Sequence, residues 1–163
     1  MRFGLRRDGV ACVIDAGGGV VPLNGRGAPA VGDLLALIDD FDGLAPALQA
    51  LADAPDDARP RMQDTAWAAP IPRPRRNLFC VGKNYHDHAA EFAASGFDSA
   101  ANGAASPAHP IFFTKAPECV IGPGDPIIVP TAVTQSADYE AEFAVVIGRG
   151  GRFIPRETAM AHV

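Results

Sequence analysis

Residues 138–148 form the stretch that most limits how this chain can fold. A β-branched run at residues 145–147 ends at Gly148, and this pattern predicts a β-strand. Side chains two residues apart project from the same face of a strand. Glu140 and Glu142 should therefore lie side by side, with their Cα atoms about 7 Å apart.

This pair of carboxylates has two interpretations. Two negative charges on one face of an apolar strand repel each other and are costly to remove from water. A divalent cation relieves both costs, and oxygen ligands suit Mg²⁺ or Mn²⁺. Glu140 and Glu142 are therefore candidate metal ligands. The alternative is a strand with one face in solvent, on which both carboxylates are simply hydrated.

Charge and cysteine content bear on several classes of function. The 163 residues carry a formal net charge of −5, and the basic cluster at residues 73–76 is interrupted by proline rather than by aromatic residues, which argues against nucleic-acid binding. No apolar run approaches the roughly 20 residues needed to cross a bilayer. Three widely spaced cysteines without metal-ligand spacing indicate a reducing cytoplasm.

The N-terminal part predicts a small α+β segment over residues 1–69. Short strands are expected at residues 1–6 and 10–15, with a glycine turn leading into a third at 20–21. Leucines at helical spacing predict helices over residues 31–38 and 44–54. Asp33 is the expected start of the first helix, and Pro46 is expected in the first turn of the second.

A proline-rich connector separates this segment from the rest of the chain. Pro70, Pro72 and Pro74 favour a stiff, extended backbone over residues 70–76. Residues 77–163 then predict a mainly β domain, because short apolar runs alternate there with proline and glycine. The expected fold class is α+β.

The second part begins with a strand and a helix that carry a candidate acid–base pair. A strand is expected at residues 77–82 and a helix at 83–94, on which His88 and Glu91 share a face. A carboxylate beside an imidazole fixes its tautomer and raises its basicity, as in a general base. The alternatives are a solvated surface pair, or a metal or zinc site that uses His86 with His88.

Further strands are expected beyond a loop at residues 95–108. The segment 110–115 reads as a strand that ends at Lys115, residues 120–126 as a turn, and residues 127–129 as another strand. A lysine at the end of a strand is usually exposed to solvent. This arrangement adds to the β content that is expected of residues 77–163.

Four of these segments occur together in a known order. They are CVGKNYHDHAAE at residues 80–91, FTKAP at 113–117, IGPGDPI at 121–127 and DYEAEFAVVIG at 138–148. In this order the chain resembles the fumarylacetoacetate hydrolase family, whose members act on 1,3-dicarbonyl and 2-oxo acid substrates. The resemblance covers residues 77–151, and residues 1–70 are similar to the variable N-terminal segment of bacterial members.

The resemblance implies a site and a fold. It implies that Glu140 and Glu142 are two of three carboxylate ligands to Mg²⁺ or Mn²⁺, and that His88 and Glu91 position or deprotonate water. It also implies a mixed β-roll, incomplete in this chain, and a homodimer. Two lysines are candidates for binding a substrate carboxylate, Lys115 and Lys83.

The resemblance also implies a function, a metal-dependent hydrolase or lyase that cleaves carbon–carbon bonds. Isomerase or decarboxylase activity in aromatic catabolism and a non-catalytic remnant that associates with an intact paralogue are alternatives. The third ligand is expected to be an aspartate some thirty residues beyond Glu142, whereas the sequence ends at Val163. We therefore expect a C-terminally truncated chain that binds metal weakly and turns over little.

Overall fold

The computed structural model describes residues 1–54, 56, 58–95 and 107–163, which form two compact units. One unit contains Met1–Ile71 together with Ile121–Val163, and the other is Pro72–Val120. Most of the loop expected at residues 95–108 lies outside the described residues. The division into residues 1–69, 70–76 and 77–163 stays a prediction.

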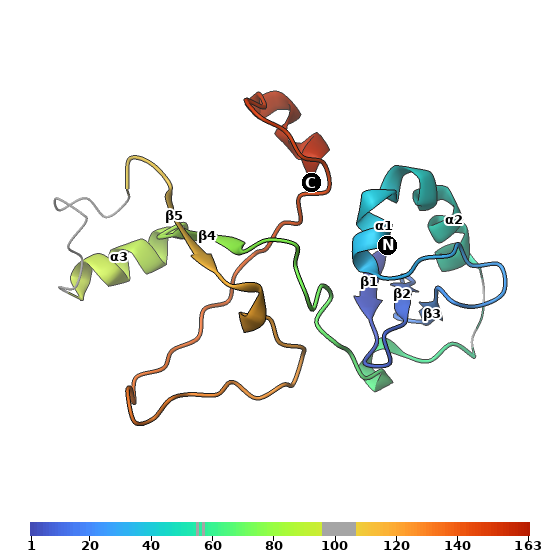
Figure 1. Ribbon diagram of the computed structural model, residues 1–163, viewed down its shortest axis with the longest axis horizontal. Helices are drawn as coiled ribbons and strands as arrows, with labels where there is room; N and C mark the ends of the chain where they lie inside the picture. The colour runs from blue at the N-terminus through green and yellow to red at the C-terminus, as the bar shows by residue number, and fades with distance from the viewer. Residues whose placement is uncertain (55, 57, 96–106) are drawn as a thin grey trace. The chain divides into compact units, whose positions relative to one another are not determined.

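The first unit begins with a three-stranded antiparallel sheet in the order β1-β2-β3 (Figure 1). Its strands are β1 (Arg2–Leu5), β2 (Ala11–Ile14) and β3 (Val20–Pro22), as the sequence predicts. The turn between β1 and β2 needs a left-handed residue, which Gly9 supplies with φ at 84°. Gly18 supplies the same conformation, with φ at 85°, between β2 and β3.

Helices α1 (Leu34–Asp39) and α2 (Phe41–Asp53) belong to the same unit as this sheet. The prediction that Asp33 starts the first helix is confirmed, because its carboxylate accepts a hydrogen bond from the Ala36 amide at 2.8 Å. The placement of Pro46 in the first turn of the second helix is wrong. That helix begins at Phe41, directly after α1, so Pro46 lies inside it.

Leucine and valine side chains form the core of this unit. Val13 and Leu48 are completely buried, and they belong to a cluster completed by Leu5, Ala11, Leu23, Leu34 and Leu37. The apolar faces of α1 and α2 therefore pack against the sheet.

The strand β1 is covered along its outer edge by the chain around Trp67. The amide of Ala68 donates to the Leu5 carbonyl at 2.8 Å, and the indole N–H of Trp67 donates to the Met62 carbonyl at 2.8 Å. A Cβ at Gly4 would come within 2.5 Å of the indole ring, so this close packing requires glycine. A covered edge is protected from pairing with another chain.

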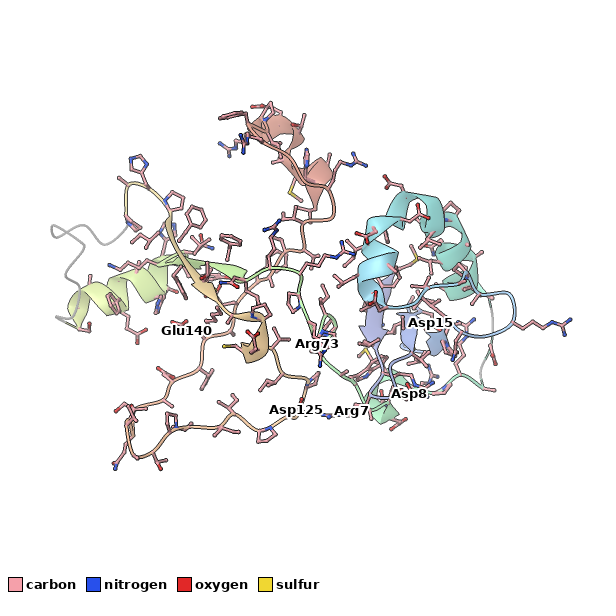
Figure 2. The ribbon with its side chains drawn as sticks, in the orientation of Figure 1. Arg7, Asp8, Asp15, Arg73, Asp125 and Glu140 are labelled. Atoms are coloured by element: carbon pink, nitrogen blue, oxygen red, sulfur yellow. The ribbon has the colours of Figure 1, made fainter. Side chains whose placement is uncertain are left out.

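Residues 121–126 of the first unit form the predicted turn. Asp125 accepts a hydrogen bond from the Gly122 amide at 2.7 Å, and Gly124 has a positive φ of 77°. Figure 2 shows Asp125 beside Arg7, with which it forms an ion pair. The hydrogen bond from Arg7, and then that from Gly122, lowers the pKa of the Asp125 carboxyl below its usual value.

The second unit is a two-stranded antiparallel sheet joined to a helix. Strand β4 (Leu78–Gly82) pairs with β5 (Ile111–Lys115), and α3 (His86–Ala94) follows β4 along the chain (Figure 1). Both strands agree with the sequence prediction. The helix begins three residues later than predicted, because Lys83 has a left-handed backbone with φ at 56° and cannot belong to an α-helix.

Two predicted strands are absent from the part of the chain that the structure describes. Residues 121–155 contain neither helix nor strand, so the strand predictions at 127–129 and within 138–148 are wrong for this structure. β-Branched side chains favour an extended backbone, but a strand also needs a hydrogen-bonded neighbour. Here Ile128 is 88% exposed and Phe143 is 83% exposed, as expected of a segment without such a neighbour.

Short 3₁₀ helices complete the described structure. They are η1 (Met62–Asp64), η2 (Pro117–Cys119) and η3 (Arg156–His162). The fold class is α+β with two small sheets, and the mixed β-roll stays a prediction. No helix in the described ranges is long and apolar enough to cross a membrane.

Candidate functional site

Helix α3 brings the predicted acid–base pair onto one face. His88 and Glu91 are three positions apart in the helix, so their side chains project from neighbouring positions on its surface. The imidazole of His88 is half-buried, the carboxylate of Glu91 is exposed, and the adjacent Ala89 is buried. The pair therefore lies where the helix surface meets solvent, which gives a small molecule access to it.

Lys83 lies close to this helix because of its backbone conformation. The left-handed φ of 56° turns the chain at the end of β4, two residues before the N-cap residue Tyr85. The Nζ atom of Lys83 then lies 4.9 Å from the centroid of the Phe92 ring. The structure thus places the Lys83 side chain against α3, the helix that carries His88 and Glu91.

Phe92 is the residue in this region that the sequence reasoning missed. Its ring centroid is 6.4 Å from that of His88, with an angle of 43° between the ring planes. The spacing of four residues from His88 places both rings on one helical face, and this spacing was the signal available in the sequence.

Lys115 does not join this group. It ends β5 and pairs in register with Leu78, at the opposite end of β4 from Gly82 and Lys83. The two ends of this five-residue strand are roughly 13 Å apart. Of the two candidate substrate lysines, the structure places Lys83 beside the acid–base helix and Lys115 away from it.

Glu140 and Glu142 belong to the other unit. Both are exposed and lie on the segment without strand structure, where Figure 2 labels Glu140. In the described part of the chain, no group of three or more histidine, cysteine, aspartate or glutamate side chains is arranged to hold a metal ion. Carboxylate oxygens suit a hard divalent cation, but these residues do not complete a site for one.

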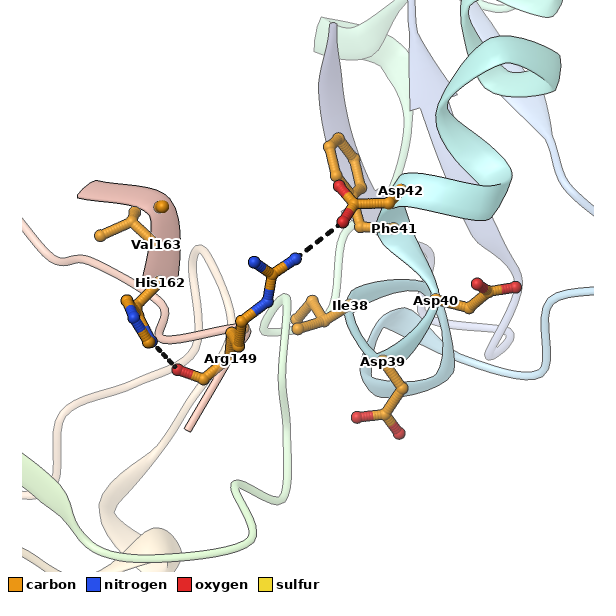
Figure 3. Close-up of a pocket in the computed structure, with 10 residues that line it drawn as sticks. Ile38, Asp39, Asp40, Phe41, Asp42, Arg149, His162 and Val163 are labelled. Atoms are coloured by element: carbon orange, nitrogen blue, oxygen red, sulfur yellow. Dashed lines mark hydrogen bonds and ion pairs between the residues drawn. The ribbon is translucent and has the colours of Figure 1, made fainter. Parts of the chain in front are cut away.

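A separate pocket of about 290 Å³ lies within the first unit (Figure 3). Arg149 forms an ion pair with Asp42 at 2.9 Å, and the ring nitrogen Nδ1 of His162 lies 2.8 Å from the Arg149 carbonyl oxygen. The side chains of Arg149 and Asp42 are 63% and 84% exposed, and ion pairs in solvent contribute little to stability. None of the candidate site residues lines the pocket.

Residues 77–163 match the model described as fumarylacetoacetate (FAA) hydrolase C-terminal, which is more than half of the chain and contains every candidate site residue. The chain belongs to the fumarylacetoacetate hydrolase family. The resemblance that the four sequence segments carry is thereby confirmed.

Several relatives in this family are named oxaloacetate tautomerases. The Bacillus subtilis (strain 168) oxaloacetate tautomerase YisK is 46% identical over 95 residues, which cover 58% of this chain and 29% of the relative. The human mitochondrial oxaloacetate tautomerase FAHD2A is 35% identical over 148 residues, covering 90% of this chain and 43% of the relative. The bovine mitochondrial oxaloacetate tautomerase FAHD2A is 33% identical over 147 residues, which cover 90% of this chain and 43% of the relative. The chain thus matches less than half the length of each relative.

Proposed function

We propose that this chain carries the acid–base part of an enzyme that interconverts the keto and enol forms of a 2-oxo dicarboxylic acid such as oxaloacetate. The observation that supports it is the grouping of Lys83, His88 and Glu91 around helix α3. The matched region includes this group, and the similar proteins from Bacillus subtilis and human mitochondria are named for this reaction.

Tautomerisation needs a proton donor and acceptor and no attacking water. In the keto-to-enol direction, a base removes a proton from the carbon next to the carbonyl, and the protonated base then gives a proton to the enolate oxygen. We assign the removal of the proton from carbon to the imidazole of His88, because imidazole accepts and releases protons near neutral pH. Glu91 stabilises the imidazolium that forms. The reverse sequence returns the proton to carbon, so atoms and charges balance.

Lys83 is the proposed anchor for the substrate. Its ammonium pairs with a carboxylate of the acid. Because Lys83 lies beside α3, a carboxylate held there places the rest of a small acid near His88. Lys115 is a weaker proposal, since the hairpin separates it from this group.

We also propose that Glu140 and Glu142 contribute two oxygen ligands to a Mg²⁺ or Mn²⁺ ion. Bound there, the cation supplies positive charge that favours the enolate form of the substrate. Two carboxylates alone leave most of the coordination positions to water or to other ligands. We therefore expect weak binding and low turnover from residues 1–163 alone.

Hydrolytic carbon–carbon cleavage is the second candidate function. The description of the matching family model as a hydrolase favours it. In that reaction His88 would deprotonate a water molecule, which attacks a carbonyl carbon and releases two acids. Product analysis separates the two functions, because tautomerisation releases no new acid.

The decay of enol-oxaloacetate absorbance, with and without the purified chain and Mg²⁺, tests the proposed function. We expect decay faster than in buffer alone, falling to the buffer rate in His88→Gln. General acid–base groups typically contribute about 10²-fold or more, so the loss should be complete within error. His109→Gln makes the same change at an exposed histidine and should retain the rate. Equal decay with and without the wild-type chain would contradict the proposal.

A further inference from the structure

The backbone at Lys83 adopts a conformation that its side chain does not favour. A non-glycine residue with φ at 56° is held in the left-handed region, which residues with a Cβ atom adopt only at an energetic cost. Glycine would adopt this turn more easily. Strained positions of this kind occur where the surrounding structure holds them, and they are frequent at functional sites.

The side chain of Lys83 is held over an aromatic ring rather than extended into water. Its Nζ atom lies 4.9 Å from the Phe92 centroid, within the range of a cation–π interaction. The negative face of the ring attracts the ammonium, and the ring itself carries no net charge. Phe92 thus fixes the direction of the charge without neutralising it.

The same ring contacts the imidazole of His88. The two centroids are 6.4 Å apart and the planes are tilted by 43°, which is within the range of aromatic pairs. Phe92 is also 38% exposed, so burial in a core does not account for its position. One side chain therefore limits the positions of both Lys83 and His88.

We propose that Phe92 is a positioning residue that holds the Lys83 ammonium and the His88 imidazole in the geometry needed for one substrate molecule. This rests on the proposed function, in which Lys83 binds a carboxylate and His88 transfers a proton. Loss of the ring should weaken substrate binding through Lys83 and slow proton transfer through His88.

Three variants separate this role from general packing. Phe92→Leu removes the ring but keeps an apolar side chain, and Phe92→Tyr keeps an aromatic face. Phe112→Leu makes the first change at an exposed phenylalanine on β5 and serves as the control. A cation–π contact at an exposed site corresponds to about a two- to fivefold change in binding.

The experiment measures KM and kcat for enol-oxaloacetate, and the proton chemical shift of the Lys83 Cε methylene. In wild type the ring should shift this signal upfield. We expect Phe92→Leu to raise KM about two- to fivefold, lower kcat and abolish the shift. Phe92→Tyr and Phe112→Leu should behave like wild type.

The outcomes distinguish this inference from the function on which it rests. An inactive wild-type chain overturns both. An active wild-type chain whose kinetics or Lys83 shift are unchanged by Phe92→Leu overturns the role of Phe92 and leaves the proposed function standing. A Phe92→Tyr variant as impaired as Phe92→Leu also overturns it, because an aromatic face alone should be sufficient.

Discussion

The side chain of Arg59 connects its own segment to the C-terminal end of α2 and to the end of β2. Its guanidinium donates hydrogen bonds to Asp15 at 2.8 Å and to the carbonyl oxygens of Leu51 at 2.9 Å and Ala54 at 2.5 Å. These carbonyls belong to the last turn of α2 and its C-cap, where helical partners are missing. Arg59 therefore acts as a C-terminal cap and ties α2 to the end of β2.

Replacing Arg59 should destabilise the first unit. Arg59→Leu leaves the helix carbonyls and the Asp15 carboxylate without this donor, and we expect the free energy of unfolding to fall by about 2–3 kcal/mol. Arg59→Lys keeps the charge but cannot reach all acceptors at once, so it should lose about half as much. Urea unfolding followed by circular dichroism measures both. Equal stability of Arg59→Leu and wild type would contradict the capping role.

Asp15 should make the stability of this unit depend on pH. The Gly19 amide, and next the Arg59 side chain, donates to its carboxylate, and these hydrogen bonds lower the pKa of Asp15 below its usual value. Because the pKa of Asp15 is lower in the folded state than in the unfolded state, the ionised carboxylate stabilises the fold at pH values above the unfolded-state pKa of about 3.9. This contribution is lost as the pH falls through the folded-state pKa.

The test compares wild type with Asp15→Asn in urea between neutral pH and about pH 2. We expect wild type to be more stable at neutral pH, and the difference between the two proteins to shrink as the pH falls below about 4. Asp64→Asn removes an exposed carboxylate of the same unit and serves as the control. A difference between wild type and Asp15→Asn that does not change with pH would refute the coupling.

At the scale of elements, local signals predicted the sheet of the first unit and the start of α1 well. Asp33 was recognisable as a helix start because its side chain suits the N-cap, and a glycine turn marked the step from β2 into β3. Both strands of the second sheet were also found from short apolar runs. For each of these elements, either the hydrogen-bonded partner strand is close in sequence or the sequence signal lies within the element itself.

The Asp33 cap gives a direct test of one such signal. Asp33→Ala removes the acceptor for the Ala36 amide, and we expect a loss of about 1 kcal/mol in the free energy of unfolding. Asp33→Asn keeps an acceptor oxygen and should cost much less. Thermal unfolding of the two variants beside wild type measures this. Similar losses in both variants would show that capping is not the cause.

Sequence patterns failed where structure depends on distant partners. The β-branched run at residues 145–147 has the composition of a strand, yet it has no strand neighbour among the described residues. Phe92 was missed for a related reason. Its contact with Lys83 depends on the left-handed turn at that lysine, which composition does not reveal. The predicted pair His88 and Glu91 needed only helical spacing and was placed correctly on α3.

At the scale of the whole molecule, exposed apolar side chains favour association with a second copy. Val145 and Ile147 are 54% and 60% exposed, and apolar surface of this kind often marks an interface. We predict a homodimer in sedimentation experiments, weakened by Ile147→Lys. Gln135→Lys adds the same charge at an exposed polar position and should leave the dimer intact. A monomer at all concentrations would refute this prediction.

We propose that this member of the fumarylacetoacetate hydrolase family moves a proton on a 2-oxo acid through His88. Deuterium incorporation at C3 of oxaloacetate in D₂O, followed by proton NMR with Mg²⁺ present, tests it most directly. We predict incorporation faster than in buffer, lost in His88→Gln, with no additional pyruvate or other cleavage product. Cleavage products without faster incorporation, or incorporation that His88→Gln leaves unchanged, would contradict the claim.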